Sequence, residues 1–118
     1  TTAQNFAKDI LKYKWRTNHA SSTGFIKNAH GSDINFNADF NFWMIPNSTV
    51  YSVEAPDGIE PSDKYSKTIL RYSDNNISAG ISYMGNYRVV VLGFPIESLS
   101  DQKQINSFIE TVINFFNK

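Results

Sequence analysis

Three short runs rich in β-branched and aromatic residues occupy the second half of the sequence and constrain its fold most strongly. The runs lie at residues 68–73, 77–83 and 87–94. Turns built from Asp, Asn and Gly separate them, at residues 74–76 and 85–86. Strands joined by turns this short pair with their neighbours along the chain as an antiparallel meander. The sequence therefore predicts a sheet that is mainly antiparallel in this half of the chain.

The last of these runs is apolar at every position from Val89 to Leu92. Apolar side chains on both faces are typical of a strand that other elements cover on both faces. We therefore expect this strand to be the innermost member of the ribbon. Gly93 predicts a close backbone approach directly after the strand, and Pro95, which has no amide hydrogen, is expected to end its ladder.

Two helices are predicted, one at each end of the chain. Residues 4–15 carry apolar side chains at helical spacing, and Trp15 is expected to close the last turn. Residues 100–117 form a second amphipathic helix. Its apolar stripe consists of Ile105, Phe108, Ile109, Val112 and Phe116.

Between the helices, residues 34–42 alternate apolar and polar side chains, which predicts a half-buried strand, and another strand is expected at residues 49–53. A chain of 118 residues forms one domain at most, and its 41% apolar content is enough to build a core. We therefore predict a single α/β domain over residues 1–118, with the α+β arrangement of a mainly antiparallel sheet and two terminal helices, or the C-terminal piece of a larger domain.

Composition excludes several classes of function. Eleven basic and eleven acidic residues cancel, so no charge excess points to nucleic acid, and the longest apolar run is far shorter than the roughly 20 residues of a membrane helix. The absence of cysteine excludes disulfides, thiolate metal sites and cysteine nucleophiles. His19 and His30 would need carboxylates such as Asp33 and Asp39 to hold a metal, and surface histidines are the favoured interpretation. No metal or cofactor is predicted.

Acidic residues near two loops are the candidates for acid–base chemistry. Glu54 and Asp57 flank Pro56, and Glu97 follows the last strand, where α/β folds place functional groups. Two carboxylates roughly 5–10 Å apart can hydrolyse a glycoside. Arg71 and Arg88 could neutralise the charge of an acidic substrate. A structural role is favoured for each of these residues, so none is assigned as catalytic.

Aromatic side chains offer a second kind of site, because they can stack on sugar rings beside Asn side chains. Trp43, Tyr51 and Tyr65 are the candidates for ligand contact, and other aromatics such as Trp15 could also serve. Burial in the core is the favoured interpretation for each one taken singly.

Five segments carry a family resemblance that extends over nearly the whole chain: residues 6–20, 51–61, 69–73, 78–80 and 87–97. The last of them reads Tyr-Arg-Val-Val-Val-Leu-Gly-Phe-Pro-Ile-Glu. Together they resemble the C-terminal portion of large secreted bacterial proteins of the xanthan lyase-like kind, which contain a class I glutamine amidotransferase-like α/β domain. The resemblance implies a secreted, periplasmic or cell-envelope location and a polysaccharide-related role.

The same resemblance implies that a parallel βα half precedes the segment seen here. The chain begins at Thr1 without an initiator methionine or signal peptide, so we expect a processed protein or a piece of a longer one. Glutamine amidotransfer requires a cysteine nucleophile, which this chain lacks. No catalytic residue of the family is therefore carried over.

Three functions stay open from the sequence. The first is a noncatalytic scaffold or glycan-contacting module, whose partners are the other domains of its parent chain and a polysaccharide. The second is a lyase or hydrolase of acidic polysaccharide, and the third is an independent carbohydrate-binding domain. An exposed edge of the sheet could also pair with a second copy to form a homodimer.

Overall fold

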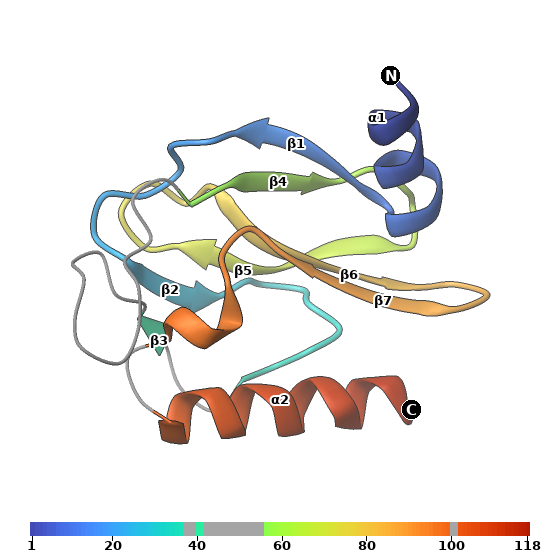
Figure 1. Ribbon diagram of the computed structural model, residues 1–118. Helices are drawn as coiled ribbons and strands as arrows, with labels where there is room; N and C mark the ends of the chain where they lie inside the picture. Colours follow the sequence, from blue (N-terminus) through green and yellow to red (C-terminus); the bar gives the residue numbers. More distant parts are fainter. Residues whose placement is uncertain (37–39, 42–55, 100–101) are drawn as a thin grey trace.

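The computed structural model describes residues 1–36, 40–41, 56–99 and 102–118. In chain order the elements are α1 (Thr2–Phe6), the π-helical turn η1 (Ala7–Leu11), β1 (Tyr13–Thr17), β2 (Phe25–Asn28), β3 (Phe40–Asn41), β4 (Gly58–Pro61), β5 (Ser66–Tyr72), β6 (Ser78–Met84), β7 (Arg88–Leu92), the 3-10 turn η2 (Ile96–Ser98) and α2 (Gln102–Phe116). Figure 1 shows three layers, with the β1–β4 ribbon and the N-terminal helix on one side of a larger sheet and α2 on the other. The chain is thus an α+β fold with mainly antiparallel pairing.

The larger sheet has the strand order β3-β2-β5-β6-β7, and each neighbouring pair is antiparallel. The predicted meander is confirmed as β5-β6-β7. The predicted innermost position of the last strand is wrong, because β7 lies at the edge of the described sheet and is half-buried along its length. The most buried strand of the meander is β6, which pairs with β5 and β7. Val90 and Leu92 of β7 pack against the core, which accounts for its apolar pattern on that face.

The predicted close approach at Gly93 is confirmed. Its amide donates to the carbonyl of Ala79 at 2.8 Å, and its carbonyl accepts from the amide of Asp57 at 2.7 Å. A Cβ atom at this position would lie 2.0 Å from the carbonyl oxygen of Asp57. Glycine is therefore required where the segment entering β4 crosses the end of β7.

The N-terminal helix is shorter than predicted. Thr1 and Gln4 form a capping box at the start of α1, and the helical turns end at Leu11. Lys12 then adopts a left-handed conformation with φ of 66°, which reverses the chain. The following residues, Tyr13–Thr17, pair with Gly58–Pro61 as a ribbon. Helix through residue 15 was the wrong prediction, because this β-prone stretch finds a strand partner far along the chain.

Residues 34–36 keep the predicted alternation without forming a strand. Ile34 and Phe36 are buried and Asn35 is exposed. The side chain of Asn28 replaces a neighbouring strand, because its Oδ1 accepts from the amide of Phe36 at 2.9 Å and its Nδ2 donates to the Phe36 carbonyl at 3.0 Å. Pairing as a strand is found at Phe40–Asn41, and the strand predicted at 49–53 lies outside the described residues.

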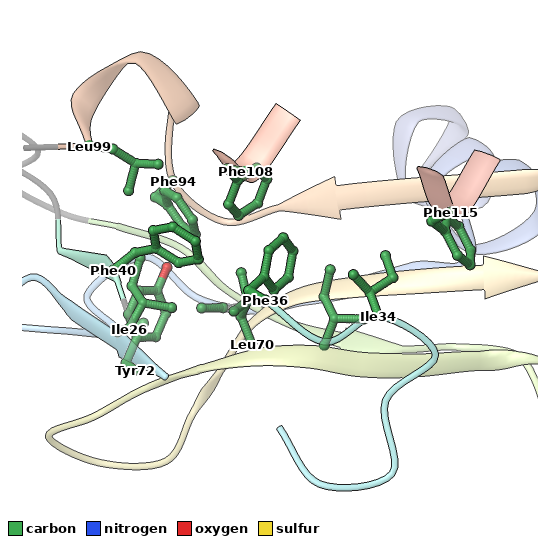
Figure 2. Close-up of a cluster of buried hydrophobic side chains, with 13 residues drawn as sticks. Ile26, Ile34, Phe36, Phe40, Leu70, Tyr72, Phe94, Leu99, Phe108 and Phe115 are labelled. Carbon is green, nitrogen blue, oxygen red and sulfur yellow. The ribbon is translucent and has the colours of Figure 1, made fainter. Parts of the chain in front are cut away.

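The core lies between the sheet and α2, as Figure 2 shows. Phe108 of α2 stacks on Phe36 with ring centres 4.5 Å apart and meets the rings of Phe40 and Phe94 edge-on at 5.4 and 6.4 Å. The C-terminal helix is confirmed at Gln102–Phe116. Its buried face centres on Phe108 and Phe115, whereas Ile109 and Phe116 of the predicted stripe are exposed.

We expect Phe108→Ala to lower the free energy of unfolding by about 3–5 kcal/mol, because the change leaves a cavity among three aromatic rings. Chemical denaturation monitored by circular dichroism measures this loss. Ile109→Ala is the matched control, since Ile109 is the next residue and its side chain is 42% exposed. Equal losses in the two variants would contradict the placement of the core.

The hydroxyl of Tyr72 joins the sheet to the start of β4. The ring is fully buried, and the hydroxyl donates to the carbonyl of Asp57 at 2.5 Å. Burial, together with the carboxylates of Asp57 and Asp74, raises the pKa of this hydroxyl above its ordinary value. The folded chain therefore holds the proton more tightly than the unfolded chain. The resulting stabilisation is complete below about pH 10, the ordinary tyrosine pKa, and is lost as pH rises further.

We expect Tyr72→Phe to destabilise the fold by about 1–3 kcal/mol at neutral pH, because the partly buried Asp57 carbonyl loses its donor. The variant should also lose less stability than the parent protein between neutral pH and about pH 11. Urea unfolding across that range measures both effects. Tyr65→Phe, at an exposed position, should show the same free energy of unfolding as the parent across this pH range. If Tyr72→Phe lost as much stability as the parent at alkaline pH, the raised pKa of Tyr72 would not be the cause of that loss.

Candidate functional site

The described candidate acids, Asp57 and Glu97, form no common cluster in the structure. Asp57 is half-buried just before β4, and its backbone bonds to Gly93 and Tyr72 give it a structural role. Glu97 is exposed in η2. Glu54 lies outside the described residues, so its pairing with Asp57 stays a prediction.

Arg88 is used at the end of α2. Its guanidinium donates to the carbonyls of Phe115 and Phe116 at 3.5 and 3.3 Å and to that of Lys118, and it lies 5.9 Å from the centre of the Phe115 ring. A cation at this position satisfies the last carbonyls of a helix and complements its dipole. Arg88 begins β7, and Asp57 bonds to Gly93 just past the other end of the strand, so their backbones lie roughly 16 Å apart at 3.3 Å per residue. Arg88 is therefore not placed to neutralise the charge of a substrate bound beside Asp57.

The candidate aromatics fare differently. Trp43 and Tyr51 lie outside the described residues. Tyr65 is 51% exposed, but the ammonium of Lys64 lies 5.0 Å from its ring centre and covers one face. Tyr87 is also exposed, and its hydroxyl donates to the carbonyl of Ile10 at 2.6 Å, so it connects the β6–β7 hairpin to η1. Neither tyrosine presents an uncovered, unengaged ring.

Among the candidate aromatics that the structure describes, Trp15 does. Its side chain is 60% exposed, and it has no ring contact with another described aromatic or cation. It lies beside a groove of about 370 Å³ between the N-terminal helix and β1. The groove, referred to below as the Trp15 groove, is lined by Ala3, Gln4, Asn5, Ala7, Lys8, Tyr13, Lys14 and Trp15. Figure 1 shows the N-terminal helix leading into β1, and residues of these two elements line the groove.

Pairing in the β1–β4 ribbon fixes the backbone position of Trp15. Trp15 is opposite Ile59 in the β1–β4 ladder, and Ile59 is buried against the rest of the protein. The reversal at Lys12 brings β1 back beside the helix that precedes it. Sequence reasoning counted Trp15 among the aromatics but expected it to finish a helix, so its exposure in a groove was missed.

Polar groups line the same groove. The side-chain amide of Asn5 makes no hydrogen bond with another described residue, and it can both donate and accept. Gln4 uses its side-chain oxygen in the capping box, which leaves its NH₂ group available. Lys8 and Lys14 add ammonium donors. An exposed indole beside amides and ammonium groups can stack on an apolar ring face while hydrogen-bonding to hydroxyls around it.

Within residues 1–36, 40–41, 56–99 and 102–118, His, Asp and Glu side chains form no group of three that could hold a metal ion, and Asp39 lies outside these ranges. No helix in those ranges combines the length and apolar character needed to span a bilayer.

Comparison with known proteins assigns no family to the chain. No protein-family model matches it, and no curated protein or solved structure is significantly similar to it. The resemblance to xanthan lyase-like and amidotransferase-like proteins therefore stays a prediction. The Trp15 groove is the feature from which a function can be argued.

Proposed function

We propose that this chain is a noncatalytic module that contacts a polysaccharide, with the Trp15 groove as its sugar-binding surface. The observation that carries the proposal is the 60% exposed indole on a strand, facing a groove rather than the core. Covering such an apolar surface with the C–H face of a sugar ring removes it from water, which is favourable in proportion to the area covered.

The size and chemistry of the groove support a sugar ligand. Its volume of about 370 Å³ falls in the lower part of the range found for small-molecule sites. Asn5, Gln4 and the two lysines supply hydrogen-bonding groups around the indole, as hydroxyl-rich ligands require.

The proposal favours binding over catalysis. Arg88 is engaged with the end of α2, and Asp57 is held at the other end of β7. No contact among the described residues favours the lyase or hydrolase alternative. The sequence resemblance supports a polysaccharide as the partner and a secreted or cell-envelope parent chain whose other domains would lie beside this module.

We expect Trp15→Ala to weaken oligosaccharide binding by about 10- to 100-fold, which corresponds to the roughly 1–3 kcal/mol that stacking on an aromatic ring contributes. A glycan array screens neutral and acidic oligosaccharides with the intact chain, and isothermal titration calorimetry measures the affinity of the best ligand. Phe25→Ala is the control, because Phe25 is 56% exposed and lies outside the groove.

Two results would overturn this function. The first is undiminished affinity in Trp15→Ala with a parent-like melting temperature. The second is the release of unsaturated sugar products from an acidic polysaccharide, which would favour the lyase alternative over a binding module.

A further inference from the structure

A second pocket, of about 540 Å³, lies over strands β2 and β5 and gathers basic side chains. It is lined by Lys27, Asn28, Ala29, His30, Arg71 and Asn76. Lys27 and Arg71 carry positive charges, His30 contributes an imidazole, and none of the six residues is acidic. The pocket is separate from the Trp15 groove and shares no residue with it.

The two permanent charges of this pocket come from opposite positions on paired strands. In the β2–β5 ladder Lys27 is directly opposite Arg71. Residues opposite each other in an antiparallel pair share a face, with Cβ atoms about 5 Å apart, and like charges at such positions are destabilising. The neighbouring pair Ile26 and Tyr72 is buried in the core, so alternation puts Lys27 and Arg71 on the other face of the sheet.

Carboxylates of the described residues do not compensate these charges. Asp74, close to Arg71 along the chain, instead accepts from the hydroxyl of Ser21 at 3.0 Å and from the amide of Ser22 at 3.1 Å. Asp33, which follows His30, pairs with Lys67 at 3.0 Å. Lys27 and Arg71 take part in none of the ion pairs formed between described residues.

A hydrogen bond to the backbone fixes the position of the Arg71 guanidinium group. Its Nη1 donates to the carbonyl of Asn76 at 2.9 Å. Asn76 has a left-handed backbone with φ of 65°, and its amide donates to the carbonyl of Tyr72, so the turn that positions this carbonyl is itself fixed. One guanidinium group presents five N–H donors, and a single bond to Asn76 leaves most of them available.

We propose that Lys27, His30 and Arg71 form a binding site for an oxyanion, the carboxylate, sulfate or phosphate group of a ligand. The planar guanidinium of Arg71 can bind two oxygens of such a group, and the ammonium of Lys27 supplies a second positive charge beside it. Asn76 also lines the pocket, whereas the side chain of Asn28 is used by the backbone of Phe36. If the proposed glycan function also holds, this site would favour acidic over neutral saccharides, and the two sites can be tested apart.

The test uses thermal unfolding of the intact chain with sodium glucuronate, inorganic phosphate or sulfate, each against sodium chloride at equal ionic strength. Ligands that bind the folded state raise the melting temperature with concentration. We expect a saturable increase with at least one of the three anions. Lys27→Gln should raise the melting temperature of the unliganded protein, because it removes the like-charge pair, and should abolish the anion-dependent increase. If Lys27 instead stabilised the fold, Lys27→Gln would lower the melting temperature of the unliganded protein.

Arg71→Gln should likewise lose the anion response, and nuclear magnetic resonance should show shifts of the Lys27, Arg71 and Asn76 amides in the parent protein. Arg16→Gln is the matched control, since Arg16 pairs with Glu60 on the outer ribbon, and it should keep the full response. Trp15→Ala should keep it too, which separates this site from the proposed sugar surface. A response to glucuronate identifies a carboxylate ligand, and a response to phosphate or sulfate alone identifies those groups. No anion response beyond chloride, or an unchanged response in Lys27→Gln and Arg71→Gln, would overturn the site.

Discussion

The contact between Phe36 and Phe108 is the interaction on which the layered arrangement depends. Phe108 comes from α2, and Phe36 comes from a segment that is neither helix nor strand, yet their rings stack 4.5 Å apart. The rings of Phe40 and Phe94 also contact Phe108. Phe40 belongs to β3 and Phe94 follows β7, and these two strands are the opposite edges of the larger sheet. One aromatic cluster therefore joins the helix to both margins of the sheet, and Arg88 adds a polar attachment at the far end of α2.

Local signals predicted the parts of the fold that local interactions determine. The β5-β6-β7 meander follows from runs of β-branched and aromatic residues joined by short turns, and α2 follows from its amphipathic spacing. The position of β7 did not follow, because an apolar run shows that a strand meets apolar neighbours and does not show its place in the sheet. The position of β7 depends on contacts between residues far apart in the sequence. Residues 26–28 of β2 pair with residues 70–72 of β5, so the sheet extends on the β5 side and β7 lies at the edge of the described sheet.

The candidate sites were harder to predict for the same reason. Trp15 was expected at the end of a helix, and a single left-handed residue, Lys12, instead turned it into a strand residue beside a groove. Lys27 and Arg71 are far apart in the sequence, and only the register of β2 and β5 makes them opposite neighbours. Arg71 was considered as a charge neutraliser, but composition and spacing gave no sign of its basic neighbour. Of the other candidates, Glu54, Trp43 and Tyr51 lie outside the described residues.

The side chain of Asn28 hydrogen-bonds to both the amide and the carbonyl of Phe36, as a neighbouring strand would. A ladder of backbone bonds opens cooperatively, whereas two bonds from one amide can break without disturbing β2 or β5. The last backbone bond to β5 before this segment runs from the amide of Ala29 to the carbonyl of Ile69, so residues 30–36 are expected to open as a local unit at a lower free-energy cost than global unfolding. Hydrogen exchange at the Phe36 amide would then report how often the aromatic layer under α2 loosens while the sheet stays folded.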